Sequence, residues 1–458
     1  MATTKIQEER IQDLNEEDAR DGDYVLYWMQ SSQRAEYNHA LEYAVRQAND
    51  FGQSLLVVFG LTDDYPEANL RHYAFMLEGL QDVEDALNKR GIKLAVRKGS
   101  PDEVALEAGK DASLIVTDRG YLRPQKEWRK KVANEAGCRV VQVETDVVVP
   151  VELASGKQEH AARTLRPRIH EYLEDFLVEL KPTKPEKQSL NMDAAGLDLS
   201  DIEKVLDGMD LDRSVGVLSH LYRGGTSEAK KVFRRFLKKS FQDYEANRNQ
   251  PQTDFVSHMS KYLHFGHVSP VWLALEAQES NADKKNIDSF VEEVIVRREL
   301  SMNFVHYTPD YDSYSCLPGW AKKTLEEHKK DDREYTYTAK QLESAGTHDE
   351  YWNAAMREMI HTGYMHNYMR MYWGKKILEW SNTPEHAYRT TLYLNNKYFL
   401  DGRDPNSFAN VAWVFGQHDR GWTERAVYGK VRYMSAGGLE RKSKPDQYVE
   451  KVEERVRG

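Results

Sequence analysis

The chain is organised around residues 361–380, HTGYMHNYMRMYWGKKILEW. The stretch has no proline and two glycines, so we expect one long helix over His361–Trp380. One face of this helix carries side chains at spacings of three, four or seven, namely Met365, Met369, Tyr372, Trp373, Lys376 and Trp380. The adjoining face carries Asn367, Arg370 and Met371. An aromatic stripe alone usually indicates core, but buried polar groups need partners, so we expect a polar ligand or a second polar element there.

Composition limits the classes of protein to consider. With 458 residues the chain is too long for one ordinary core, so two domains are expected. A net charge of -10 argues against a generally basic nucleic-acid coat but not against a local basic patch. Two cysteines give no disulfide framework and no Cys-rich metal site. Because neither a signal peptide in residues 1–21 nor a membrane-spanning apolar run is visible, we expect a soluble protein of the cytoplasm, or of the nucleus in a eukaryote.

Short apolar strands alternate with amphipathic helices in the N-terminal third. The expected strands are Tyr24–Met29, Ser54–Phe59, Ile92–Val96, Leu114–Thr117 and Arg139–Val143, with helices such as Ala35–Phe51 and Asn69–Arg90 between them. This pattern predicts a parallel α/β sheet of the Rossmann type, covered by helices on both faces. No glycine-rich phosphate loop follows a strand, so a phosphate-cradling role has no support. Arg34 and Asn38 follow the first strand, where they either line a ligand crevice or form a solvated helix start.

The second half of the chain is helical. A Pro- and Lys-rich connector, Lys181–Lys187, and a weakly patterned acidic segment, 191–216, precede it. We therefore expect an α/β domain over 22–150, a long linker over 151–222 and an all-α domain over 223–458.

Several polar clusters in the helical half are candidates for binding. Hydroxyls near a glycine in Val256–Gly266 suit phosphates or an anionic ring, although such spacing is common in loops. Glu293 and Arg297 are four apart, a spacing that equally predicts a plain surface ion pair. From Asp401 to Lys444 there are eight Lys or Arg against five Asp or Glu, with Trp residues among them. Arginines beside aromatic rings suit phosphate contacts with base stacking, whereas Arg441–Lys444 is better read as a solvated tail.

Three motifs in this order and spacing resemble a known family. They are Thr362–Asn367 with Arg370-Met371, Ser260-x-Tyr262-Leu263-His264-Phe265-Gly266, and Asp401-Gly402-Arg403-Asp404-Pro405-Asn406. The chain resembles the class II cyclobutane pyrimidine dimer photolyases of the photolyase and cryptochrome flavoproteins, from about Tyr24 to Lys444. The resemblance implies an N-terminal α/β antenna domain joined by a long linker to an all-helical domain that binds FAD.

The resemblance also implies a light-driven DNA repair enzyme, a carbon–carbon lyase. Reduced, anionic FAD would pass an electron to a pyrimidine dimer flipped out of damaged DNA. The protein would bind this DNA as a monomer. An antenna chromophore, a deazaflavin such as 8-hydroxy-5-deazaflavin or a folate, is possible. No metal and no membrane partner is implied.

The family's functional residues map onto this chain by motif. FAD contacts are expected from Tyr244, Ser257, His258, Met259, Ser260, Arg297, Asn367, Arg370, Asn395, Asp401, Gly402 and Asn406. Arg370 is expected to pair with Asp401, and the amide oxygen of Asn395 to face flavin N5. The lesion and DNA are expected to meet Arg248, Glu293, Met371, Trp413, Arg420 and Trp422, with Glu293 hydrogen-bonded to a thymine carbonyl.

Two departures from other photolyase classes stand out. Val411, two residues before Trp413, occupies the place of the tryptophan that starts their electron chain, whereas Trp352, Trp373 and Trp380 match the class II path. Trp373 and Trp380 are seven apart, roughly 10 Å along a helix axis. The alternative interpretation is that these three tryptophans only pack in the hydrophobic core. Arg297 stands where some relatives have a tryptophan beside the dimer.

Three other functions compete with dimer repair. A cryptochrome-like photoreceptor shares fold and flavin, but Glu293, Met371 and Trp413 are kept, and the segment after Lys444 is short for a signalling tail. A nucleotide-binding α/β protein is disfavoured by the missing phosphate loops. Repair of (6-4) photoproducts would need paired histidines, and only His366 lies within the motif.

Overall fold

The computed structural model describes residues 6–457, so the first five residues of the charged N-terminal segment lie outside it. The chain forms two compact units, and neither is continuous in sequence. Unit 1 comprises Met1–Gly156, Arg168–Arg234 and His258–Ser280, and unit 2 comprises Lys157–Pro167, Arg235–Ser257 and Asn281–Gly458. The domain limits expected from the sequence stay a prediction.

Unit 1 is built on a six-stranded sheet in the order β1-β6-β5-β2-β3-β4. The strands are β1 Ile11–Asp13, β2 Tyr24–Trp28, β3 Ser54–Leu61, β4 Lys93–Lys98, β5 Ala112–Asp118 and β6 Arg139–Val143. All neighbours pair in parallel except β1, which pairs antiparallel with β6 through Ile11 and Val143. The predicted parallel α/β sheet is therefore present, with an added antiparallel edge strand that the sequence analysis missed.

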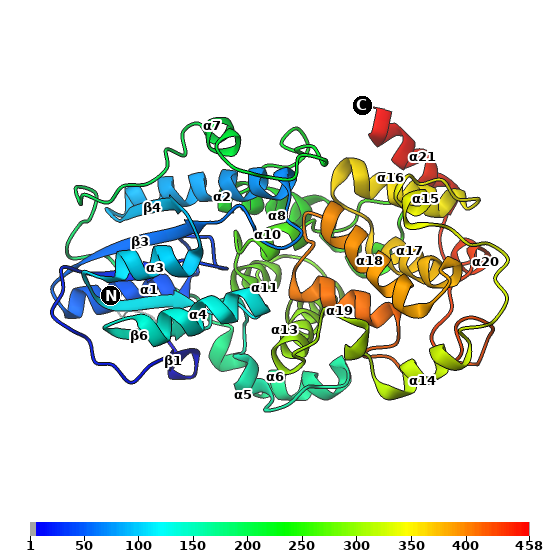
Figure 1. Ribbon diagram of the computed structural model, residues 1–458, viewed down its shortest axis with the longest axis horizontal. Helices are drawn as coiled ribbons and strands as arrows, with labels where there is room; N and C mark the ends of the chain where they lie inside the picture. The colour runs from blue at the N-terminus through cyan, green and yellow to red at the C-terminus, as the bar shows by residue number, and fades with distance from the viewer. Residues whose placement is uncertain (1–5, 458) are drawn as a thin grey trace. The chain divides into compact units, whose positions relative to one another are not determined.

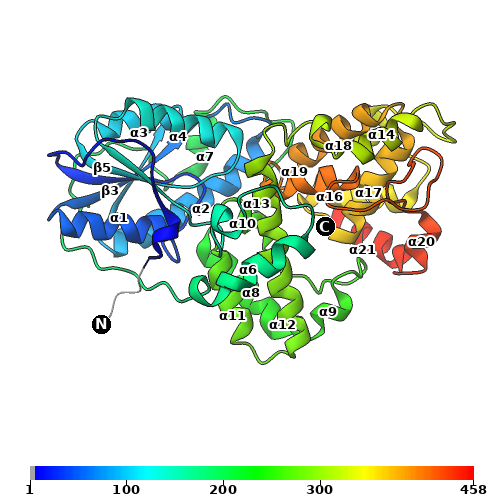
Figure 2. The same ribbon diagram turned by 90° about the horizontal axis from the view of Figure 1, so that it is seen from below.

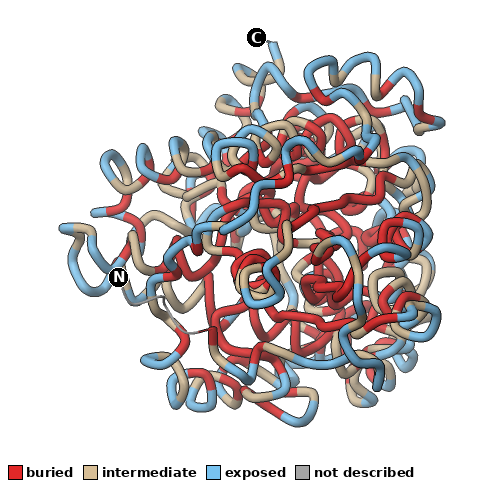
Figure 3. Tube along the Cα trace, turned by 90° about the vertical axis from the view of Figure 1, so that its left-hand side faces the viewer, coloured by how far each residue is buried: buried red, intermediate tan, exposed pale blue. Residues whose placement is uncertain are grey.

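Alternating residues of each strand enter two separate cores. Val25 and Tyr27 of β2 pack with apolar residues of α1 (His39–Asp50) and α2 (Leu70–Lys89). Leu26 and Trp28 pack on the other face with residues of α3 (Pro101–Gly109) and α4 (Arg123–Glu135). Figure 2 shows α3 and α4 on one side of the strands and α1 on the other. In Figure 3 the exposed trace is concentrated in outer turns and loops, while much of the inner trace is buried. Burial on both faces explains why the strands read as nearly continuous apolar runs.

The remaining elements are helical. The helices that follow the sheet are α5 Val151–Ala154, α6 Ala162–Phe176, α7 Ile202–Asp207, α8 Thr226–Lys239, α9 Tyr244–Asn247, α10 Ser260–His264 and α11 Pro270–Gln278. Then come α12 Lys284–Val291, α13 Arg298–Tyr307, α14 Gly319–Glu327, α15 Ala339–Glu343, α16 Glu350–Thr362, α17 Asn367–Trp380, α18 Pro384–Tyr398, α19 Pro405–Val414, α20 Ala436–Glu440 and α21 Pro445–Arg457. Four short elements complete the chain, the 3₁₀ turns Glu8–Arg10, Phe241–Asp243 and Tyr314–Cys316 and the π-helical turn Glu292–Arg297. Every helix within residues 6–457 is too short or too polar to cross a bilayer.

The expected single helix over His361–Trp380 is wrong. Helix α16 ends at Thr362, Gly363 takes the left-handed conformation at φ 62°, and α17 begins only at Asn367. Glycine is the usual residue for this helix-terminating conformation, so Thr362-Gly363 was a C-cap signal. Figure 1 shows α16 and α17 as two separate helices beside α18.

The plain ion pair between Glu293 and Arg297, one of the two alternatives that their spacing left open, is absent within the described residues. Glu292–Arg297 forms a π-helical turn between α12 and α13. Its wider i→i+5 spacing brings Arg297 to Glu292 instead, with Nε and Oε1 3.1 Å apart. Glu292 also receives two hydrogen bonds from Arg166, which leaves Glu293 on a different side of the turn.

Candidate functional site

Arg370 and Asp401 form the ion pair that was expected between them. The guanidinium of Arg370 on α17 reaches both carboxylate oxygens of Asp401, each at 3.0 Å. Its Nε donates to the carbonyl of Met365 at 3.0 Å, and its Cζ lies 3.8 Å from the ring centroid of Phe399. The two-pronged ion pair, together with the hydrogen bond to Met365, holds the guanidinium plane in one orientation. The position of Arg370 therefore depends on the loop over 363–366, which carries Met365.

Asn395, on α18, is connected through Ser407 to the backbone of Asp401. A Cβ on Gly402 would lie 2.9–3.0 Å from Asn395 O, Asn396 Cα and Phe399 O, so this close approach of backbone requires glycine. Asn395 donates both Nδ2 hydrogens, to Asn396 Oδ1 and Ser407 Oγ, at 3.0 Å each. Within residues 6–457 no hydrogen bond reaches its Oδ1. The amide is thus fixed with an acceptor oxygen left for a ligand.

Glu293 pairs with Arg248, a contact that sequence spacing did not predict. Arg248 Nη1 lies 2.8 Å from Glu293 Oε1, and both side chains are partly exposed. Arg248 also lies over the ring of Tyr244, with 5.9 Å from Cζ to the centroid. Burial raises the pKa of Tyr244, so its hydroxyl stays protonated. Three residues expected at the cofactor or lesion are therefore in one cluster.

The three tryptophans expected to form an electron path are buried near one another. The rings of Trp352 and Trp380 meet edge to face at a centroid distance of 5.6 Å. Trp352 Nε1 donates to the carbonyl of Trp373 at 2.9 Å, and the Trp373 ring lies 6.4 Å from that of Phe399. Phe399 in turn lies against Arg370. A continuous series of contacts thus runs from Trp380 to the Arg370 guanidinium.

A cationic and aromatic cluster surrounds Trp413 and Trp422. The guanidinium of Arg432 lies 5.7 Å from the Trp413 ring centroid and 4.5 Å from that of Trp422. Arg420 lies 5.2 Å from the Trp422 ring, and Trp422 Nε1 donates to Asp419 at 3.2 Å. The structure therefore joins Trp413 and Trp422 through Arg432, a residue that motif reasoning missed and that only the local excess of Lys and Arg could have indicated.

Lys375 is a second residue that the sequence analysis missed. It is fully buried on α17, donates from Nζ to the carbonyl of Val414, and lies 5.2 Å from the Trp413 ring centroid. Burial lowers the pKa of Lys375 to about 7; Asp419 opposes this shift and Arg432 adds to it. A lysine inside an apparently apolar helix face gives no sequence signal that separates it from a surface lysine.

The other expected site residues are placed as follows. Asn367 and Arg297 are exposed, Met371 and Asn406 are half-buried, and Asn406 Oδ1 accepts from Ser301 Oγ at 2.8 Å. Ser257 ends a segment of unit 2, whereas His258, Met259 and Ser260 belong to unit 1. Among residues 6–457 no group of three or more His, Cys, Asp or Glu is placed to hold a metal.

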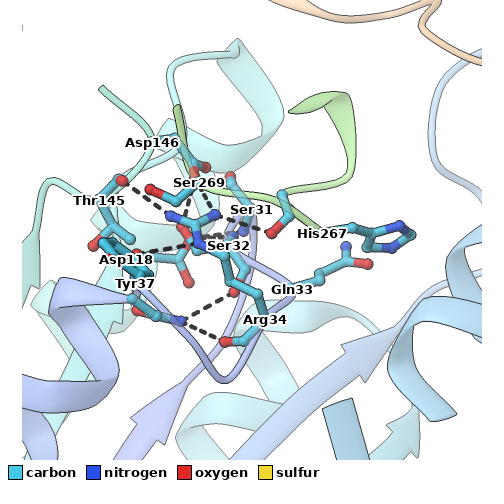
Figure 4. A network of polar contacts seen from close by, with 12 residues as sticks. Ser31, Ser32, Gln33, Arg34, Tyr37, Asp118, Thr145, Asp146, His267 and Ser269 are labelled. Atoms are coloured by element: carbon cyan, nitrogen blue, oxygen red, sulfur yellow. Dashed lines mark hydrogen bonds and ion pairs between the residues drawn. The ribbon is translucent and has the colours of Figure 1, made fainter. Parts of the chain in front are cut away.

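Arg34 and Asn38, the crevice candidates of unit 1, are both buried. Arg34 donates to Asp146 Oδ1 at 2.8 Å, to Thr145 O at 3.0 Å and to Gly266 O at 2.9 Å (Figure 4). Asn38 caps α1 through Leu41 N and donates to Tyr27 Oη, 3.0 Å in each case. A solvated helix start is therefore wrong, and both side chains bond to polar groups of the protein itself.

Asp118, at the end of β5, completes this buried network. Its carboxylate accepts from the backbone N–H groups of Gln30, Ser31 and Ser32, at 2.8, 2.6 and 3.2 Å. Burial and the charge of Asp146 raise the pKa of Asp118, while these donors oppose the shift. The loop after β2 is thus fixed at the topological switch point between β2 and β5.

Known proteins resemble this chain both in sequence and in fold. The DNA photolyase family model matches residues 25–187. A deoxyribodipyrimidine photo-lyase from Methanothermobacter thermautotrophicus is 51% identical over 449 residues, which cover 98% of each chain. Among solved structures, a class III photolyase from Agrobacterium tumefaciens matches with TM-score 0.74 and 18% identity, over 95% of this chain and 87% of that one. A cryptochrome from Synechocystis matches with TM-score 0.70 and 15% identity, over 95% and 88%.

Similarity to solved structures and similarity in sequence support two different statements, one on the fold and one on the family. The solved structures are under 25% identical, so they establish the photolyase and cryptochrome fold that the sequence predicted. The archaeal relative is similar over its whole length, at an identity where family membership is secure. The chain belongs to the DNA photolyase family.

Proposed function

We infer that this chain is a deoxyribodipyrimidine photo-lyase that uses light to split cyclobutane pyrimidine dimers in DNA. The observation that carries this inference is the 51% identity, over 98% of both chains, to a protein of that activity. Unit 2 contributes the supporting geometry, because several of its expected cofactor and lesion residues lie in contact with one another.

The residues of unit 2 fit an FAD cofactor. The Asn395 Oδ1 acceptor and the buried Nε1–H of Trp373 both lack a partner within the described residues. The Arg370 guanidinium, held flat by Asp401, suits the face of a large planar ring. We propose that Arg370 and Asn395 orient the flavin ring, with Asn395 Oδ1 accepting a hydrogen bond from N5–H. Bound FAD, in its reduced anionic form, would supply the electron that light releases.

Glu293 and Arg248 are proposed to act on the lesion as one unit. The Arg248 guanidinium 2.8 Å from Glu293 restrains the carboxyl group and balances its charge. When DNA binds, Arg248 can turn to a phosphate, and a protonated Glu293 carboxyl can then donate a hydrogen bond to a thymine carbonyl. That contact would stabilise the negative charge that develops on the dimer.

The Trp413 and Trp422 cluster is proposed to receive the flipped dimer. Half-buried Trp413, with Met371 on α17, would pack on the pyrimidines, while exposed Arg420 and Trp422 would fill the space that flipping leaves in the duplex. Arg432 lies against both indoles, so we assign it to the same surface.

The class II assignment is also a proposal. Its support is the contact series from Trp380 through Trp352 to Trp373, together with Val411 in place of the tryptophan used by other classes. We propose that these indoles deliver electrons from outside to the flavin, and that the protein acts as a monomer.

An antenna chromophore is proposed for unit 1. Trp28 Nε1, Gln30 Oε1 and Gln33 Oε1 are buried at the end of β2 without partners in the described chain. A planar heteroaromatic group such as a deazaflavin or a folate could satisfy them. An absorption band of the purified protein beyond those of flavin would identify this group.

The proposed function is tested with the purified protein loaded with FAD, reduced, and mixed with an oligonucleotide that contains one thymine dimer. Blue light should restore intact thymines, while dark samples and (6-4) photoproduct substrates should remain unchanged. Binding of FAD with no repair under light would reject the lyase and favour the photoreceptor alternative, which the cryptochrome fold match keeps in view.

A further inference from the structure

The C-terminal helix α21 is anchored on a buried carboxylate of α16. Glu358 is fully buried, and its Oε2 accepts a hydrogen bond from Tyr448 Oη at 2.6 Å. Arg455, about two turns further along α21, donates from Nη1 to Glu358 Oε1 at 3.1 Å. Tyr448 is itself fully buried, and burial raises the pKa of its hydroxyl, which therefore remains a donor.

The same carboxylate also holds the loop before α17. Glu358 accepts a hydrogen bond from the backbone N–H of His366, the N-cap residue of α17. This loop carries Met365, whose carbonyl receives Arg370 Nε, and it precedes Asn367. Glu358 thus connects α21 to the loop that orients Arg370.

A second set of contacts connects α21 to the other expected cofactor segment of unit 2. Lys451 Nζ donates to the carbonyls of Pro251, at 2.9 Å, and Thr253. Gln250 Nε2 donates to Lys442 O, just before α21, at 3.1 Å. Residues 250–253 lie between Arg248 and Ser257. The C-terminal region therefore fixes the segment that leads to Ser257, an expected FAD contact.

We propose that α21 is a positioning element for the FAD site, which acts through two positioning residues, Glu358 on α16 and Lys451 on α21 itself. Through Glu358 and Lys451 the helix holds backbone that lies next to expected FAD residues in two separate segments. The Glu358 carboxylate accepts hydrogen bonds from Tyr448, Arg455 and His366. Loss of one of these donors leaves a buried carboxylate with too few hydrogen bonds. This proposal rests on the proposed function, because it assumes that FAD binds unit 2.

The test uses apoprotein of the full chain and FAD alone. Tyr448→Phe removes one hydroxyl and keeps the ring, and Lys451→Met removes the ammonium and keeps most of the stem. Tyr351→Phe is the matched control, because its hydroxyl, also on α16, contacts Asp446 of α21 at 3.0 Å without touching Glu358. FAD affinity is measured by quenching of flavin fluorescence, and flavin orientation by visible circular dichroism of the saturated protein.

We expect Tyr448→Phe and Lys451→Met each to weaken FAD binding about tenfold and to alter the flavin dichroism, while Tyr351→Phe changes neither. Thermal unfolding of each apoprotein gives the separate effect on stability. Unchanged affinity and dichroism in both variants would overturn the proposal, even if both unfold at lower temperature. If Tyr448→Phe fails to fold, Lys451→Met decides alone. Failure of the unsubstituted protein to bind FAD would instead reject the proposed function, and this proposal with it.

Discussion

Replacement of Lys375 by methionine should make the stability of the protein less dependent on pH. Lys375 is fully buried on α17, and its pKa is lowered by burial from 10.5 to about 7. Methionine has a similar length and no charge, so Lys375→Met removes the titrating group while it keeps most of the packing. The Nζ hydrogen bond to Val414 is lost, which lowers stability by about 1 kcal/mol at every pH.

The direction of the pH effect follows from the two protonation states. Between pH 7 and pH 10.5 the unfolded chain holds a proton on this lysine and the folded chain does not, so unfolding takes up a proton. The free energy of unfolding therefore rises with pH in this window, by up to about 1.4 kcal/mol per pH unit for one group. From pH 7.5 to pH 9.5 the gain from Lys375 is about 2.5 kcal/mol, and Lys375→Met should lack it.

Urea unfolding of the apoproteins at pH 7.5, 8.5 and 9.5 measures this difference directly. Other titrating groups act in both proteins, so the subtraction of variant from unsubstituted protein removes most of their effect. Lys323→Met, at a side chain that is 78% exposed on α14, is the control and should show no pH-dependent difference. A difference between unsubstituted protein and Lys375→Met that stays constant over this range would refute a neutral Lys375, and with it the electrostatic description of the Trp413 cluster.

Three further predictions address the proposed repair reaction. Trp380→Phe should nearly abolish photoreduction of bound oxidised FAD by an external reductant, whereas chemically reduced enzyme should still repair; normal absorbance kinetics would assign this indole to packing alone. Glu293→Ala should leave FAD bound and photoreducible but lower the repair yield per absorbed photon, since the dimer's negative charge loses a stabilising contact. If that yield holds while DNA affinity falls, Glu293 serves binding only. Arg420→Ala should weaken binding of dimer-containing duplex much more than of undamaged duplex in gel-shift titrations, and equal losses would mark Arg420 as an ordinary phosphate contact.

The sheet of unit 1 could be predicted because each strand is an apolar run bounded by turn residues. Burial on both faces removes the need for alternation, so β2, β3 and β5 are evident from composition alone. Strand β1 could not be predicted in the same way. It has three residues, Ile11–Asp13, and is partly or fully exposed, because it pairs only through the edge of β6.

The helical errors both arise from local backbone geometry that periodicity does not report. Gly363 was present in the quoted stretch, but a lone glycine lowers helix propensity by only about 1 kcal/mol, which does not by itself predict a break. The π-helical turn at Glu292–Arg297 has no distinctive residue type, and its effect is a change of register. That change gives Glu293 a partner in Arg248, and this contact requires residues 45 positions apart to meet.

The candidate site divides between residues that motifs reveal and residues that only tertiary contact reveals. Arg370, Asn395 and Asp401 lie in motifs whose spacing resembles a known family, and the pair between Arg370 and Asp401 is present. Lys375 and Arg432 belong to no such motif. Their place is set by where α17 and the 419–432 loop meet Trp413, which depends on packing between distant segments.

The acidic composition of the chain is compatible with DNA as the proposed partner. The net charge of -10 describes the whole molecule, but charges on exposed side chains are screened beyond about 8–10 Å at physiological ionic strength. A phosphate that approaches Trp422 therefore experiences mainly Arg420 and Arg432, whose guanidinium groups lie 5.2 and 4.5 Å from that ring. Asp419 lies beside them, yet its carboxylate is engaged by Trp422 Nε1 and by the backbone N–H of Arg420. Local arrangement, rather than net charge, thus determines which surface of this acidic protein can bind a polyanion, and the aromatic rings between the two arginines favour a strand whose bases are already unstacked.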